Sequence, residues 1–317
     1  MDMAAAARHA RLPAHPAPHS LCFDAENDAL MLATEDPPAL VRVERDGRVE
    51  QQAALPSKPA GVCIRDSGGV VLAMATSGSS GGGLYVLQGG APPRLFCDVL
   101  GDGGPAAAHD PEAAAAITGR RLQCELTVTV PDAAGRLWLG TRSKLTPPSD
   151  APPPGELFCV EGARKMVDGA FVMCGVANDV HEVGAVSHIA GIAFASDSIF
   201  VADAPTKTVR KFAFHQRMAT LESPATLSLS VPVSALAVDV SNNLYVALDD
   251  NTVHRSAPPH ETAQHLLSLP MKAIRAMEFG GKTLYVTGID DENKGVVLAV
   301  DLGQDITGAP MAACALG

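Results

Sequence analysis

The stretch Ser241-Asn242-Asn243-Leu244-Tyr245-Val246-Ala247 joins a polar turn to a four-residue apolar run, and this pattern recurs along the chain. The chain has 317 residues, and comparable runs begin at intervals of 40, 67, 62, 45 and 40 residues. The six runs are Leu30–Ala33, Val70–Ala73, Leu137–Gly140, Ile199–Ala202, Leu244–Ala247 and Leu284–Thr287. A supersecondary unit that repeats at a period of this length is typical of propellers and solenoids.

Each apolar run stands between two others. In the fifth unit, Ala235–Val238 precedes the turn, and Thr252–His254 follows the run. A strand, a tight turn, a second strand, a loop and a third strand form the pattern of a propeller blade. The main alternative, a β-sandwich, fills only about 100 residues and would require two or three domains joined by a linker, which the sequence lacks. We therefore predict an all-β fold, a six-bladed β-propeller.

The predicted organisation is a single propeller domain over 19–317, preceded by an N-terminal extension over 1–18. Two segments rich in Ala, Pro and Gly, Gly101–Ala116 and Pro147–Pro154, are interpreted as loop insertions. A closed ring removes exposed strand edges, so one terminus should pair with the last blade. Either Arg8–Pro13 or Pro310–Ala315 could supply the closing strand.

Composition excludes several classes of partner. The formal net charge is −11 and no run of Lys or Arg is present, so we expect no nucleic-acid binding. No stretch reaches the ~18 apolar residues of a membrane span, so we expect no membrane association. The seven cysteines form no C-x-x-C pair, and the first residues lack the apolar core of a signal peptide. We expect a cytoplasmic protein, while the Ala- and Arg-containing start leaves a weak mitochondrial presequence open.

The third and fourth units carry the most recognisable residues. The fourth reads His188-Ile189-Ala190-Gly191-Ile192-Ala193-Phe194 and continues with Ile199-Phe200-Val201-Ala202-Asp203-Ala204-Pro205-Thr206. The third contains the block Asp132–Thr141, which includes Gly135, Arg136 and Trp138. In this order, these segments resemble the regucalcin (senescence marker protein)/gluconolactonase/luciferin-regenerating-enzyme family. The resemblance covers nearly the whole chain and implies the same six-bladed fold.

The resemblance also implies a reaction and a metal site. In the family one divalent cation such as Ca²⁺, held by Glu, Asn and Asp side chains, polarises a sugar lactone, and the Asp acts as general base. Here those three places hold His19, Ala190 and Ser234, and a further Asn position holds Thr127. We therefore expect no metal ligands and no catalytic residues of the family type, and the sequence leaves the cofactor unknown.

Residues that begin the innermost strands should point toward the central channel. This rule makes the following residues candidates for the funnel wall: His19, Glu125, Thr127, His188, Ala190, Ser234 and Ala276. Two histidines and a carboxylate could form a metal site, but no spacing rule links them, and solvated histidines are the simpler interpretation. Two functions stay open. One is a divergent, lactonase-like ester hydrolase, and the other is a non-catalytic propeller that binds a small molecule or a protein partner in its funnel.

Overall fold

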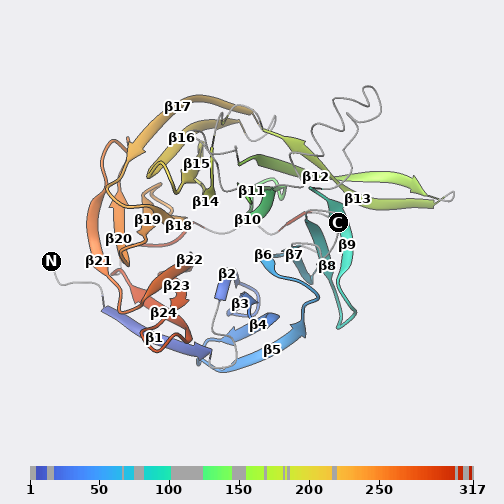
Figure 1. The fold of residues 1–317 in the computed structure, drawn as a ribbon, viewed down its shortest axis with the longest axis horizontal. Coiled ribbons are helices and arrows are strands. Elements are labelled where there is room, and N and C mark those ends of the chain that lie inside the picture. The colour runs from blue at the N-terminus through green and yellow to red at the C-terminus, as the bar shows by residue number, and fades with distance from the viewer. Residues whose placement is uncertain are drawn as a thin grey trace.

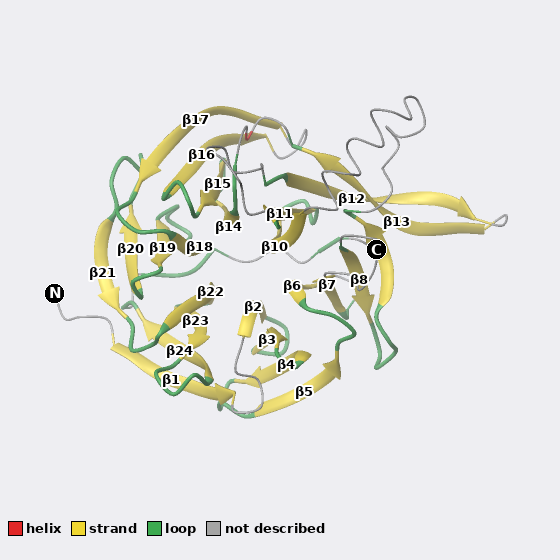
Figure 2. Ribbon diagram, viewed as in Figure 1, coloured by secondary structure: helices red, strands yellow, loops and turns green. Residues whose placement is uncertain are grey.

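The computed structural model describes residues 5–12, 18–65, 68–74, 82–100, 124–144, 155–167, 170–180, 183, 186–215, 220–303, 306–309 and 314–315. Within these ranges it contains strands, turns and loops, one residue of 3₁₀ helix at Val183 and no α-helix (Figure 2). None of the elements described is a helix long and apolar enough to cross a membrane. Both predicted insertions, Gly101–Ala116 and Pro147–Pro154, lie outside the described residues.

Six antiparallel four-stranded sheets stand around a central axis (Figure 1). The first two blades are β2 (Pro18–Asp24), β3 (Ala29–Glu35), β4 (Pro38–Glu44) and β5 (Val49–Ala54), then β6 (Pro59–Ile64), β7 (Val70–Met74), β8 (Gly83–Leu87) and β9 (Arg94–Asp98). The next two are β10 (Cys124–Pro131), β11 (Leu137–Ser143), β12 (Leu157–Val167) and β13 (Ala170–Asp179), then β14 (Ile189–Phe194), β15 (Ser198–Asp203), β16 (Thr208–His215) and β17 (Thr220–Ser228). The fifth is β18 (Val233–Val238), β19 (Leu244–Leu248), β20 (Thr252–Ser256) and β21 (Gln264–Ser268). The sixth contains β22 (Ala273–Gly280), β23 (Thr283–Ile289) and β24 (Gly295–Asp301).

The predicted six-bladed propeller is confirmed. Every recurring apolar run forms the second strand of a blade, and every run before it lies in an innermost strand. All five residues of β7 and all five of β19 are buried, because blades pack against both faces of a second strand. The outermost strands are different: β5 has four exposed residues among its six. A strand with one face in water carries little apolar signal, which explains why the repeat pattern shows three strands per blade instead of four.

The N-terminal segment closes the ring. Strand β1 (Ala5–Leu12) pairs antiparallel with β24 and becomes the outermost strand of the sixth blade (Figure 1). Ala10 and Leu12 are buried in the cluster shared with the first blade. Of the two closing strands that the sequence allowed, the structure uses the one within the first twelve residues, so this part of the 1–18 segment is an integral strand of the propeller.

The C-terminal segment crosses one end of the channel. Gly308 donates its backbone N–H to Gly281 and pairs with Asp239, and Cys314 donates to Ile64. Ala315 then donates to Gly135. These partners lie where innermost strands end, in four different blades. The tail therefore spans the face of the propeller opposite the strand starts, which we call the closed end.

Candidate functional site

A β-bulge interrupts each of the six innermost strands near its start. The register with the second strand slips across one residue in every blade, and these residues are His19, Ala60, Thr127, Ala190, Ser234 and Arg275. An extra residue in one strand re-aims its side chain and is common beside functional sites. Because the six bulges occupy equivalent positions, they define a ring around the channel, which we call the bulge ring.

A cavity of about 420 Å³ runs along the axis from the bulge ring toward the closed end. Its wall contains five of the ring residues: His19, Ala60, Thr127, Ala190 and Arg275. At the other end it reaches the turn residue Asn242 and the tail residue Ala309. Between these ends the wall is mainly apolar, with Leu, Ile, Met and Phe side chains. The methyl groups of Ala60 and Ala190 leave the ring open, so the mouth and the deep part of the cavity form one space.

His19 is held by a charged neighbour at the mouth. Its Nδ1 lies 2.9 Å from Oε1 of Glu35, and Nζ of Lys58 lies 3.0 Å from the same oxygen. Burial acts to raise the pKa of Glu35, but the hydrogen bonds and charges of His19 and Lys58 outweigh burial and lower the pKa to about 2. Glu35 is therefore ionised at neutral pH and fixes the orientation of the imidazole. No described residue hydrogen-bonds Nε2 of His19, and the side chain lies in the cavity wall.

Glu125 and His188 lie beside the mouth, outside the cavity wall. Glu125 forms an ion pair with Nε of Arg142, and Arg142 and His188 form a β-bridge between neighbouring blades. Burial and the charge of Arg142 lower the pKa of His188, while Asp203 and Glu125 act in the opposite direction. The imidazole is therefore neutral at pH 7. His19 and Glu125 thus have different ion-pair partners, and the described residues contain no cluster of three or more His, Cys, Asp or Glu side chains suited to a metal.

The remaining candidates are placed as follows. Thr127 lies in the cavity wall and donates its hydroxyl to the backbone oxygen of Ile189, at 2.6 Å. Ala190 and Ala276 also line the cavity. Ser234 belongs to the bulge ring, but its Oγ is shielded from solvent, has no hydrogen-bond partner in the described structure and lies outside the cavity wall.

Among the wall residues that sequence reasoning missed, Arg275 and Glu278 carry ionisable groups. Arg275 is the ring residue of the sixth blade, exposed at the mouth, where the strand-start rule pointed to its neighbour Ala276. Glu278 lies deeper and is only 9% exposed, with Oε1 accepting a hydrogen bond from the backbone N–H of Phe23 at 3.1 Å. Burial raises the pKa of Glu278 to about 8, so its carboxyl is neutral at pH 7. The bulge that exposes Arg275 is a feature of strand pairing, so no sequence signal pointed to this residue.

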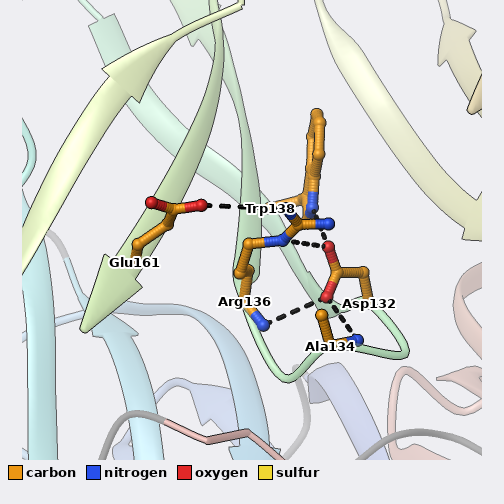
Figure 3. A network of polar contacts seen from close by, with 5 residues as sticks. All are labelled: Asp132, Ala134, Arg136, Trp138 and Glu161. Carbon is orange, nitrogen blue, oxygen red and sulfur yellow. Dashed lines mark hydrogen bonds and ion pairs between the residues drawn. The ribbon is translucent and has the colours of Figure 1, made fainter. Parts of the chain in front are cut away.

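The block Asp132–Thr141 has a structural role at the closed end. Asp132 is fully buried and accepts hydrogen bonds from the backbone N–H of Ala134 and from Nε of Arg136, at 2.9 and 2.7 Å (Figure 3). It also accepts one from Nε1 of Trp138 at 3.0 Å. The Trp138 ring packs edge-on against Phe214, whose ring centroid is 5.5 Å away in the next blade. These contacts fix a turn and join two blades, and none of them lies in the cavity wall.

The comparisons with known proteins match this architecture. The model of the protein family described as SMP-30/Gluconolactonase/LRE-like region matches residues 17–290. The chain belongs to this family. No curated protein matches significantly. Among solved structures, a luciferin-regenerating enzyme is similar with a TM-score of 0.70 and 14% identity, covering 98% of this chain and 99% of that one. Regucalcin from Agrobacterium tumefaciens (TM-score 0.68, 14% identity, 96% of both chains) and a gluconolactonase from Xanthomonas campestris (TM-score 0.67, 13% identity, 94% and 90%) are also similar.

The bulge ring of this SMP-30/gluconolactonase-like propeller does not fit the divalent cation that the family resemblance implies. Hard cations require several oxygen ligands, preferably carboxylates. The ring supplies one imidazole, one guanidinium, two hydroxyls and two methyl groups, and one of the hydroxyls, that of Ser234, lies outside the cavity wall. The positive charge of Arg275 at the mouth also repels a cation. The donor set is instead suited to neutral or anionic groups.

Proposed function

We propose that this propeller binds a small organic molecule in its central cavity through side chains of the bulge ring and the channel wall, without a central divalent cation. The observation that carries the proposal is the cavity itself. Its volume of about 420 Å³ lies in the usual range for small-molecule sites. A mainly apolar wall with a few convergent polar groups is also the usual composition of such sites.

The charges of the mouth support a neutral or anionic ligand. Arg275 is exposed there and has no ion pair within 4.0 Å in the described structure. The carboxylate of Glu35, by contrast, is already paired with His19 and Lys58. Asp249 is an acidic group influenced by Arg275: burial raises the pKa of Asp249, and the charge of Arg275 acts to lower it. Arg275 is therefore the charged group most available to a ligand entering the cavity.

Hydrolysis of a lactone-type ester is the second candidate function. Family membership and the solved gluconolactonase and regucalcin structures favour it. The bulge ring lacks the oxygen ligands of a central cation, so catalysis by this chain would require another source of base and electrophile. Binding in the cavity is common to both candidates and is therefore tested first.

Substituting Ala190 by Phe tests the binding proposal, because it fills the open ring without touching the blade core. Thermal-shift and calorimetric titrations with a panel of small organic acids, esters and lactones should show ligands for the native chain that Ala190→Phe no longer binds. Ala225→Phe, at an exposed position of the outer strand β17, is the matched control and should bind as the native chain does. Ligands that bind both variants equally would place the site elsewhere and refute the proposal.

The absence of a cation site is tested by restoring the family residues. The triple variant His19→Glu, Ala190→Asn, Ser234→Asp should bind Ca²⁺ in a calorimetric titration, whereas the native chain should not. Tight Ca²⁺ binding by the native chain, lost on Ala190→Phe, would contradict the cation-independent site.

A further inference from the structure

The contacts of His19 are those of an oriented base. A histidine acts as general base when one ring nitrogen is held by a carboxylate and the other faces the reacting group. In His19 the Nδ1 is held by Glu35 at 2.9 Å, and Nε2 has no hydrogen-bond partner in the described part of the structure. The side chain lies in the cavity wall, so a water molecule or ligand in the cavity can meet Nε2.

Glu35 is itself fixed in place. Lys58 lies 3.0 Å from the same carboxylate oxygen that binds His19, and the two partners lower the pKa of Glu35 to about 2. The carboxylate therefore stays ionised over the whole neutral range and stabilises the imidazolium that forms when His19 takes a proton. A surface ion pair would leave the imidazole facing bulk water, whereas this pair presents it to a largely apolar channel.

Arg275 supplies the second group that ester hydrolysis requires. It occupies the bulge of β22, and β22 is packed beside β2, which carries His19. The two residues thus hold adjacent positions in the bulge ring and belong to the same cavity wall. A guanidinium at the cavity mouth can hydrogen-bond a carbonyl oxygen and stabilise the negative charge that develops on it.

We propose that the chain hydrolyses a carboxylic ester, lactones included, without a metal ion, with His19 as the general base, Glu35 as its positioning residue and Arg275 as the group that binds the carbonyl oxygen. In this step Nε2 of His19 takes a proton from water, and the water oxygen forms a bond to the carbonyl carbon. The bond from that carbon to the alkoxy oxygen then breaks, and the imidazolium returns the proton to the alkoxide. The products are a hydroxy acid, if the ester is cyclic, and an unchanged enzyme. The proposal rests on ligand binding in the cavity.

Dihydrocoumarin is a suitable probe, because its fused aromatic ring matches the apolar wall and its ester is cyclic. Its lactam analogue resists hydrolysis and so reports binding alone. The full chain at pH 7.5 with chelator present should open dihydrocoumarin above the rate of the buffer. His19→Gln should lower kcat by about a hundredfold or more and leave lactam binding within about threefold. Added imidazole should restore part of the activity of His19→Ala.

The variant Glu35→Gln tests whether Glu35 assists catalysis through His19 or only supports the fold. The amide can still accept a hydrogen bond from Nδ1, but it no longer stabilises the imidazolium, so kcat should fall and the acidic limb of kcat/KM should move to lower pH. Lys58, His188 and Arg275 are other charged or titratable groups around this site, and all three remain in the variant. Arg275→Gln should lower kcat/KM by roughly tenfold or more. His265→Gln, on the exposed outer strand β21, is the matched control and should match the native chain.

The outcomes separate this inference from the binding proposal. Turnover that His19→Gln leaves intact, or that chelator abolishes, overturns the inference. Lactam binding that Ala190→Phe removes, without any turnover of dihydrocoumarin, overturns the inference and leaves the binding proposal standing. Failure of the lactam to bind at millimolar concentration, together with no turnover, overturns the inference, and the wider ligand panel then decides the binding proposal.

Discussion

Replacing Glu278 by Gln should leave the stability unchanged or slightly lower at acidic pH and should raise it at alkaline pH. The carboxyl is buried in the channel wall, which raises its pKa from 4.5 to about 8, against the opposing hydrogen bond from Phe23. The folded chain therefore keeps a proton that the unfolded chain releases above pH 4.5. Its contribution to stability is complete below that pH, falls as the pH rises, and is fully lost above pH 8.

The size of the effect follows from the shift. At about 1.4 kcal/mol for each pKa unit, the native chain should lose about 3 kcal/mol of unfolding free energy between pH 4 and pH 7, and about 5 kcal/mol by pH 9. Glu278→Gln has no charge to bury, so it removes this loss. At pH 5 the variant should be equal to the native chain or about 1 kcal/mol less stable, since its amide N–H group lacks a partner. At pH 9 it should be more stable by several kcal/mol.

Urea unfolding at a series of pH values measures this difference. Trp138 is the only tryptophan and is fully buried, so its fluorescence reports the transition. Cys22 and Cys63 lie near Glu278, and burial raises the pKa of both thiols, which keeps them neutral across the range. Glu50→Gln, at an exposed position of β5, is the control and should follow the native chain. A stability difference between Glu278→Gln and the native chain that stays constant from pH 5 to pH 9 would refute the reasoning.

Three further changes test the parts of the fold that shape the cavity. Asp132→Asn should lower the unfolding free energy by about 3 kcal/mol, because it removes a buried charge paired with Arg136, and a loss below about 1 kcal/mol in urea unfolding would contradict this. Deleting residues 1–12 should lower the melting temperature and promote association, measured by calorimetry and light scattering, because β24 becomes an exposed edge; deleting residues 1–4 should change little. Gly308→Val should detach the tail, since even a Cβ at this position would lie 1.9 Å from Cβ of Phe279, and the amides of Val240 and Ala309 should then exchange hydrogen faster. Unchanged exchange at both amides would show that the tail adapts in place.

The sequence predicted the blades more completely than the site. Second strands such as β19 are buried on both faces, so each appears as a short continuous apolar run after a turn, and six such runs determine the number of blades. The same logic placed His19, Thr127 and Ala190 near the channel, because they begin innermost strands. It did not predict Arg275, since alternation counted along β22 favours Ala276, and the bulge shifts the register by one residue.

The amino-acid sequence by itself thus determined a six-bladed ring and its family, because strands buried between blades appear as short apolar runs in the local sequence. Tertiary structure decided everything that depends on which segments meet. The N-terminal strand closes the ring, the tail covers one end, and His19 is joined to Glu35 and Lys58 at the mouth. No pattern in the sequence marks Glu278. Its neutral state follows from burial and from contact with Phe23 of the first blade, 255 residues away along the chain. Contacts between distant segments determine the protonation of Glu35 and Glu278 and the orientation of His19, and local sequence patterns do not predict such contacts.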